Sequence, residues 1–81
     1  VISKRSQTVL KATITSLDVT SNIFNTIKAS EIAIKTFQII AKSDNIWEIV
    51  FLIEYDKKII LDELIIELKN INYVINMEYI K

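Results

Sequence analysis

Two pairs of carboxylates are the strongest candidates for reactive chemistry in this chain. Asp62 and Glu63 are adjacent, and Glu54 and Asp56 lie two residues apart. General acid–base chemistry needs two carboxyl groups that converge on one cleft, with one of them held protonated by burial. Adjacent residues of a helix point about 100° apart, and the helix dipole favours acidic residues in a first turn. We therefore interpret Asp62 and Glu63 as a solvated helix start and expect no catalytic residue.

Oxygen ligands that suit Mg²⁺ or Ca²⁺ form a second candidate group. They are Asp44, Asn45, Glu48, Glu54 and Asp56. Their spacing does not match that of a calcium-binding loop, and six residues of a strand separate Glu48 from Glu54 by roughly 20 Å. We expect no metal site and no bound cofactor.

Four residue types are missing from the 81 residues, namely cysteine, histidine, glycine and proline. Without cysteine and histidine the chain has no disulfide, Cys/His zinc site, thiol nucleophile or histidine-based triad. Without glycine it has no phosphate-cradling loop of the known types. Thr20 and Ser21 carry hydroxyl groups at a predicted helix start. No residue that could act as a base is arranged beside them, so we interpret them as a helix cap and not as nucleophiles. These absences predict a protein that is not an enzyme.

The net charge is +0, but the charges are unevenly distributed. Residues 1–42 carry six basic and two acidic side chains, whereas residues 43–81 carry four basic and eight acidic ones. Either the two halves interleave in one fold, or a polar face meets a partner or a membrane surface. We expect no nucleic-acid binding, because the third strand carries Glu48 and aliphatic side chains where stacking rings and cations would be needed. Trp47 is interpreted as a core residue.

Hydrophobic periodicity divides the first half of the chain into a strand, a helix and a second strand. Alternation predicts a strand over Gln7–Leu17, and a four-residue repeat predicts a helix over Ser21–Ser30. Ile32–Lys42 alternates again, but its phase slips, which predicts a bulge near Lys35 and Thr36.

The second half repeats this order with a strand first. A turn at Ser43–Asn45 leads to a strand over Trp47–Tyr55, and an amphipathic helix follows at Leu61–Lys69. Tyr73–Ile80 is the last strand, with Val74, Met77 and Tyr79 as its expected core residues. The order β-α-β-β-α-β predicts an α+β, ferredoxin-like fold, in which a four-stranded antiparallel sheet carries two helices on one face. Asn, Asp and Ser are expected to form its turns, because glycine and proline are absent.

The third strand contains five consecutive apolar residues, Ile49–Ile53, which suggests burial on both of its faces. Val50 and Leu52 are expected on the face opposite the helices, joined by Ile40 and Ile75. Either these are a few tolerated apolar residues on a small domain, or a second copy or a neighbouring domain covers them. We favour the second interpretation, so these four residues are our candidate interface.

The predicted element order, together with Asp18-x-x-Ser21-x-Ile23 between the first strand and helix, resembles the ACT domains. ACT domains are small regulatory modules with an Asp-x-x-Gly-x-Leu pattern, in which the glycine lets backbone N–H groups approach an amino-acid effector. Ser21 stands at the glycine position and Thr20 at that of the usual proline. The resemblance implies at most a weak effector loop, formed by Asp18, Ser21 and Asn22.

The second half is similar to the C-terminal domain of the MgtC/SapB family of bacterial membrane proteins. The similar segments are Lys57–Leu68 and Tyr73–Tyr79. This resemblance implies an ACT-like tail on the cytoplasmic side of the membrane, in proteins associated with magnesium homeostasis. The whole chain, residues 1–81, would then be one domain of a larger protein, with residues 1–6 as its linker.

Two functions follow from these resemblances. The first is a non-catalytic regulatory or assembly domain, which would contact its own membrane domain and form a homodimer or another protein contact without entering the membrane. The alternative is a ligand-sensing module that binds an amino acid at a dimer interface near Asp18–Ile23.

Overall fold

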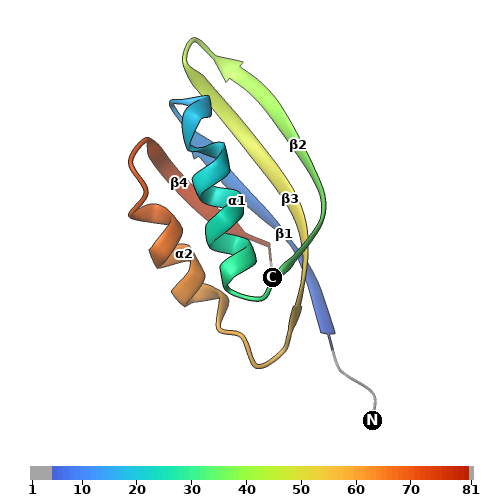
Figure 1. The fold of residues 1–81 in the computed structure, drawn as a ribbon. Helices are drawn as coiled ribbons and strands as arrows, with labels where there is room; N and C mark the ends of the chain where they lie inside the picture. Colours follow the sequence, from blue (N-terminus) through green and yellow to red (C-terminus); the bar gives the residue numbers. More distant parts are fainter. Residues whose placement is uncertain (1–4, 81) are drawn as a thin grey trace.

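Strands and helices account for most of residues 5–80, the part of the chain that the computed structural model describes (Figure 1). The strands are β1 (Arg5–Ile14), β2 (Ala33–Ser43), β3 (Ile46–Asp56) and β4 (Val74–Tyr79), and the helices are α1 (Thr20–Ala29) and α2 (Leu61–Lys69). A short 3-10 helix, η1 (Leu17–Val19), precedes α1. The strands form one antiparallel sheet in the order β2-β3-β1-β4, and both helices lie on the same face of it (Figure 1). The predicted ferredoxin-like α+β fold is confirmed.

The core lies between this face of the sheet and the two helices. Alternate residues of the two central strands are fully buried there: Leu10, Ala12 and Ile14 of β1, and Ile49, Phe51 and Ile53 of β3. From the helices, Ile23 and Ile27 of α1 and Leu64 and Leu68 of α2 pack against them. Full burial of each large apolar side chain contributes about 1.5–3 kcal/mol relative to exposure. The alternation seen in the sequence therefore sets which face of the sheet the helices cover.

The start of the chain differs from the prediction in two respects. β1 already includes Arg5 and Ser6, which the sequence analysis assigns to a linker; residues 1–4 lie outside the described part. β1 also ends at Ile14 and not at Leu17, because the chain turns there into η1.

The predicted cap of the first helix by Thr20 and Ser21 is wrong. Val19 occupies the N-cap position of α1 and makes no side-chain cap hydrogen bond. The capping side chain lies earlier, where the Ser16 hydroxyl accepts a hydrogen bond from the Asp18 N–H at 3.3 Å and caps η1. Because the chain enters α1 through the 3-10 helix η1, the capping side chain lies before η1 and not at the start of α1. The buried Thr20 hydroxyl has no hydrogen-bond partner within the described residues.

Bulges interrupt the pairing of both edge strands. The β2–β3 register shifts between Ile34 and Thr36, so the predicted bulge at Lys35 is confirmed. A second shift, between Ala41 and Ser43, makes Lys42 another extra residue, and neither it nor the shift at Ile75 in β4 was predicted. Bulges and lysines on edge strands both hinder unwanted strand pairing.

Within residues 5–80, three residues adopt left-handed backbone conformations that a glycine would adopt more readily. Their φ angles are 63° at Glu31, 59° at Asn45 and 72° at Tyr73. Asn45 conforms to the expectation that Asn, Asp and Ser form the turns, because asparagine tolerates this region. Glu31 and Tyr73 do not tolerate it well, and a left-handed conformation costs such residues about 1–2 kcal/mol each.

Replacement of Glu31 by glycine is expected to stabilise the fold. Glu31→Gly removes the steric cost of the left-handed conformation at an exposed turn position, so the free energy of unfolding should rise by about 1 kcal/mol. Urea denaturation monitored by circular dichroism measures the change. The matched control is Lys28→Gly inside α1, which should lower stability by about 1 kcal/mol. A loss of stability in Glu31→Gly would contradict the assignment of strain to this turn.

Candidate functional site

The face of the sheet that no helix covers, here called the open face, carries a row of apolar side chains. Leu52 of β3 pairs with Val9 of β1, and the Ile80 N–H donates to the Val9 carbonyl at 3.0 Å. These three side chains, together with those of Gln7 and Thr8, line a shallow hollow of about 370 Å³. Val50 is the next residue of β3 on this face and is also half-buried. The open face therefore offers a continuous apolar strip, defined as Val9, Val50, Leu52 and Ile80.

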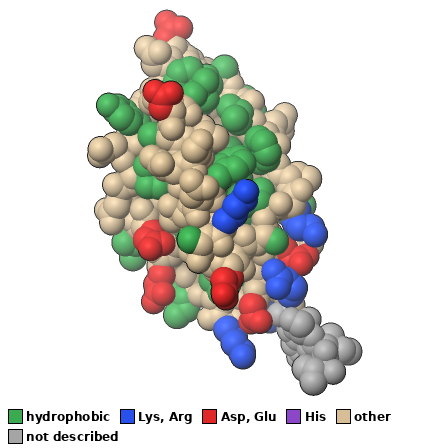
Figure 2. All heavy atoms as spheres, viewed as in Figure 1, with side chains coloured by type: hydrophobic (Ala, Val, Ile, Leu, Met, Phe, Trp, Pro, Cys, Tyr) green, Lys and Arg blue, Asp and Glu red, His purple; other side chains and the backbone are tan. Residues whose placement is uncertain are grey.

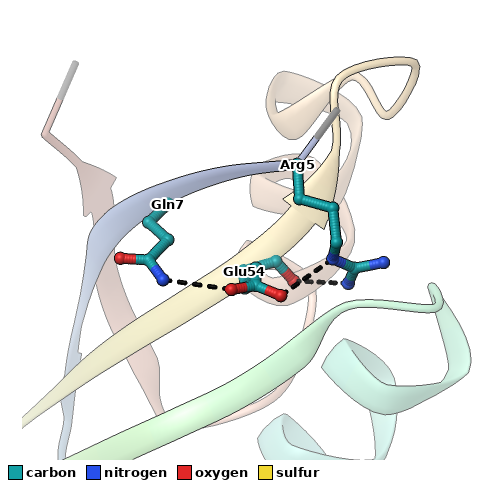
Figure 3. Close-up of polar contacts among 3 residues, drawn as sticks. All are labelled: Arg5, Gln7 and Glu54. Carbon is teal, nitrogen blue, oxygen red and sulfur yellow. Dashed lines mark hydrogen bonds and ion pairs between the residues drawn. The ribbon is translucent and has the colours of Figure 1, made fainter. Parts of the chain in front are cut away.

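Charged networks bound this strip at both ends. At one end the Arg5 Nε lies 2.9 Å from Glu54 Oε1, and Gln7 Nε2 donates to Glu54 Oε2 at 3.0 Å (Figure 3). The Arg5 guanidinium also donates to the Glu54 carbonyl at 3.4 Å. At the other end Lys42 lies 4.0 Å from Glu48. An apolar centre with a polar rim is the usual anatomy of a protein contact surface.

The pKa of the Glu54 carboxyl is lowered by these partners. The hydrogen bond from Gln7 is the largest cause, and the positive charges of Lys35 and Arg5 act in the same direction. Glu54 therefore stays ionised at neutral pH and fixes two β1 side chains against β3.

The structure brings three of the four predicted interface residues to the open face. Val50 and Leu52 lie on β3, and Ile40 lies on β2 opposite Glu48, diagonal to Val50. Ile75 is the extra residue of the β4 bulge and is 58% exposed, and no strand pairing places it beside the other three.

The sequence analysis missed two members of the strip, Val9 and Ile80. The alternation of β1 contained the signal for Val9, because it has the opposite parity to the buried Leu10 and Ala12. Ile80 lies just beyond β4, and its backbone bond to Val9 continues the strand pairing that brings its side chain to the strip.

A second apolar surface, which the sequence analysis also missed, lies on the helix side of β2. Phe37 and Ile39 point to this side but are 52% and 42% exposed. Phe37 meets Phe24 of α1 edge to face, with ring centroids 4.8 Å apart, and Phe24 in turn meets the buried Phe51. We call Phe24, Phe37 and Ile39 the β2 shelf; in Figure 2 hydrophobic side chains gather between α1 and β2.

The predicted effector loop borders a hollow lined by both polar and apolar side chains, the latter including Val19 and Ile71. Asp18 and Asn22 line a depression of about 610 Å³ between the start of α1 and the loop that precedes β4. Its other polar side chains are Asn25, Thr26, Asn72 and Tyr73. Ser21 is exposed and is not part of the lining. A carboxylate and three side-chain amides could hydrogen-bond a small zwitterion.

The adjacent acids of α2 have a structural explanation. The Tyr79 hydroxyl donates to Asp62 at 2.7 Å, which ties β4 to the first turn of α2 and raises the pKa of Tyr79 above its usual range. Glu63 is exposed beside an open hollow with Lys58 and Glu67. Among residues 5–80, no three Asp, Glu, His or Cys side chains gather closely enough to hold a metal ion. No helix in this part of the chain has the length and hydrophobicity needed to cross a membrane.

Solved structures with the same fold include an ACT domain, part of a dehydrogenase and the C-terminal domain of an MgtC protein. The ACT domain of a GTP pyrophosphokinase from Chlorobium tepidum is 18% identical, with a TM-score of 0.77 over 95% of this chain and all of that one. A homoserine dehydrogenase from Thiobacillus denitrificans is 16% identical (TM-score 0.77), and the match covers 96% of this chain but only 17% of that one. The C-terminal domain of MgtC from Mycobacterium tuberculosis is 11% identical (TM-score 0.76), with coverage of 91% and 84%.

In contrast to the comparison of structures, comparisons of the sequence gave no match. No protein-family model matches the chain, and no curated protein matches it either. At these low identities the structural likeness establishes the fold alone. The resemblance to ACT domains and to the MgtC C-terminal domain is thereby confirmed at the level of the fold.

Stability should fall at acidic pH partly through Glu54. Its lowered folded-state pKa means that the carboxylate stabilises the fold fully above the ordinary value of about 4.3, and that this contribution is lost as the pH falls through the lowered value. Glu54→Gln should therefore show a smaller loss of unfolding free energy between neutral and acidic pH, measured by urea denaturation. Glu67→Gln, on exposed α2 surface, is the control and should keep the wild-type pH slope. Identical slopes for wild type and Glu54→Gln would contradict the role given to this network.

Proposed function

We propose that this chain is a non-catalytic regulatory or assembly domain of an MgtC/SapB-like membrane protein linked to magnesium homeostasis. The observation that carries the proposal is the open face, where an apolar strip lies between two charged networks. The likeness to the MgtC C-terminal domain supports the choice of parent protein. The domain would lie on the cytoplasmic side of the membrane and act through contact with other polypeptide, either a second copy or its own membrane domain.

The open face suits a protein partner better than other partners. The four side chains of the strip are aliphatic, so they include no ring on which a nucleic-acid base could stack, and the neighbouring charges of Glu54 and Glu48 are already paired with Arg5 and Lys42. A partner that covers Val50 and Leu52 would remove half-buried apolar surface from water, which favours association.

The double variant Val50→Lys, Leu52→Lys is expected to fold but to lose contacts made through the open face. Both side chains are only half-buried, so lysine can direct its ammonium group to solvent while its stem covers the strand. Light scattering across a concentration series should report a lower mass for the variant than for the wild type. Thr13→Lys, on the same face beyond the strip, is the control and should keep the wild-type mass. Equal masses for all three proteins would exclude self-association through this face.

The parent protein can be tested through its gene. The reading frame that encodes this chain should contain hydrophobic membrane spans upstream of Val1. A frame without such spans would exclude the membrane-protein part of the proposal and leave the contact role to be judged by light scattering.

The hollow beside Asp18 and Asn22 favours a second candidate function, the binding of a free amino acid. Its carboxylate suits an ammonium group, and its amides suit a carboxylate, so a zwitterion fits its chemistry. The substitution of serine for the effector glycine leaves a side chain where close backbone approach is usual, and this weighs against tight binding.

A thermal-shift panel of the twenty amino acids tests this candidate. A ligand present at 100 times its Kd should stabilise the fold by about 2.7 kcal/mol. Asn22→Ala should abolish the shift, whereas Asn70→Ala, at the end of α2 and outside the lining, should retain it. A panel without any shift in the wild type would exclude amino-acid sensing by the isolated domain.

A further inference from the structure

The β2 shelf adjoins a hollow on the helix side of the sheet. The hollow measures about 380 Å³ and is lined by Phe24, Lys28, Ile34, Lys35, Thr36 and Phe37. Ile39, the remaining residue of the shelf, lies on the same face of β2, two residues beyond Phe37. Within residues 5–80 no helix lies on the β2 side of α1 (Figure 1). The shelf and the hollow therefore form one uncovered surface beside α1.

Aromatic contacts connect this surface to the core. The Phe24 ring meets the exposed Phe37 edge to face, and it also meets the fully buried Phe51, with ring centroids 5.2 Å apart. Phe37 is thus held in position through one intervening ring. An aromatic side chain that is already held in place loses little conformational entropy on binding, and such side chains are frequent anchors of protein contacts.

Positive charge lies at the hollow end of this surface. Lys28 and Lys35 line the hollow, and both side chains are exposed. Among the described residues neither lysine forms an ion pair, although the charge of Lys35 contributes to the lowered pKa of Glu54. No acidic side chain from this part of the chain lines the hollow. In Figure 2 basic side chains border the hydrophobic ones between α1 and β2. The charges therefore select an occupant that is negative at this end.

The position of the surface suits an α-helix. Helices pack with their axes about 8–10 Å apart, so a further helix beside α1 would lie over β2. It would extend the layer of helices that α1 and α2 form over the rest of the sheet (Figure 1). An amphipathic helix presents apolar side chains at a spacing of three or four residues, and these would cover Phe37 and Ile39.

Other negatively charged partners fit less well. Membrane proteins bind anionic lipid headgroups through clusters of roughly 4–8 basic residues, whereas this hollow has two lysines. A single-stranded nucleic acid needs a positively charged groove that follows its backbone, and Lys28 and Lys35 lie together at one end of the shelf.

The charges also determine the direction of the docked helix. Lys28 lies in the last turn of α1, and Lys35 lies near the start of β2. Acidic side chains are most favourable in the first turn of a helix, where they offset the helix dipole. A helix with this acidic first turn at the hollow would run antiparallel to α1, and its positive end would lie beside the negative end of the α1 dipole.

We propose that the β2 shelf and the adjoining hollow dock an amphipathic helix of another polypeptide, with acidic residues in its first turn set against Lys28 and Lys35. Apolar side chains of that helix cover Phe37 and Ile39, and the backbone edge of β2 stays free. The contact uses a surface other than the open face, so it goes beyond the assembly role proposed above, and the two are tested separately.

Two synthetic peptides test the charge of the occupant. The acidic peptide is a helix of about eighteen alanine, glutamine and leucine residues, with leucines three and four residues apart and three glutamates in its first turn. The basic peptide has lysines in place of the glutamates. Fluorescence anisotropy at low salt should give an affinity at least about tenfold higher for the acidic peptide, and salt should reduce the difference. Because the net charge of the chain is +0, general attraction does not produce this result.

Charge reversal locates the site. Lys28→Glu combined with Lys35→Glu should bind the acidic peptide at least about tenfold more weakly than the wild type, and should prefer the basic peptide. The matched control, Lys57→Glu combined with Lys69→Glu, changes two exposed lysines that do not line the hollow and should keep the wild-type preference. Circular dichroism checks the fold, and the single substitutions replace any double variant that does not fold.

A second pair of variants tests the apolar part of the contact. Phe37→Ala should weaken binding of the acidic peptide about tenfold, because it removes the exposed ring. Ile66→Ala, which changes a comparably exposed side chain on α2, should leave the affinity unchanged. Amide chemical shifts on addition of the acidic peptide should change most along α1 and β2, and less at Val9 of the open face.

Three results would overturn the proposal. The first is a wild-type protein that does not bind the acidic peptide at millimolar concentration, and the second is equal affinity for the two peptides. The third is a set of shift changes centred on the open face. Vesicles of phosphatidylcholine and phosphatidylserine provide the last comparison. If the wild type sediments with them, Phe37→Ala does not, and neither binds the acidic peptide, the surface contacts a membrane and the proposal is wrong.

Discussion

The helices of this domain are too short and too few to cover its sheet, and both of its apolar surfaces follow from that shortage. α1 has ten residues and α2 has nine, so each is about 15 Å long, whereas the eleven residues of β2 or β3 extend about 36 Å. The helices therefore bury one face of the central strands, where Phe51 is fully enclosed, and leave Phe37 and Ile39 of the outer strand exposed. The second face of the sheet receives no helix at all. Contact with other protein, as proposed above, would bury both surfaces.

The connectivity of the fold determines where the charges lie. In the order β2-β3-β1-β4 the first half of the chain supplies one outer strand and the second half supplies the other. α1 packs near β2 and α2 packs near β4, so each helix stays with the outer strand from its own half. The central pair, β1 and β3, mixes the two halves, and there the opposite charges meet in the contact of Arg5 with Glu54. The opposite net charges of the two halves of the sequence therefore offset each other in the middle of the sheet and remain separate at its edges.

Element order and the covered face could be predicted because both depend on local periodicity. The alternation of β1 and β3 and the helical spacing of Leu61, Leu64 and Leu68 correspond directly to burial. Other features depend on contacts that periodicity does not encode. The left-handed conformation of Tyr73 goes with a long-range bond, since its carbonyl accepts from the Thr15 N–H at 2.9 Å. Likewise, Phe37 and Ile39 are exposed because coverage by α1 reaches only as far as the contact of Phe24 with Phe37, and this depends on where the helix lies. Of the candidate interface, Val50, Leu52 and Ile40 were placed correctly on the open face by strand parity, whereas the β4 bulge displaced Ile75.

The bulges of β2 and the left-handed turns on either side of it both concern how far this edge strand can pair with another strand. A long uncharged edge strand tends to pair with any other strand, and lysines or bulges limit such pairing. In β2 the two devices coincide, because both extra residues are lysines and they lie at the two ends of residues 36–41. The β2 edge is thus blocked for strand pairing at both ends and available for it over six residues, which is also the length of β4. Left-handed turns at Glu31 and Asn45 precede and follow the strand. The bulges and lysines at both ends of this segment therefore restrict strand pairing at the β2 edge to its six central residues, which limits its tendency to aggregate.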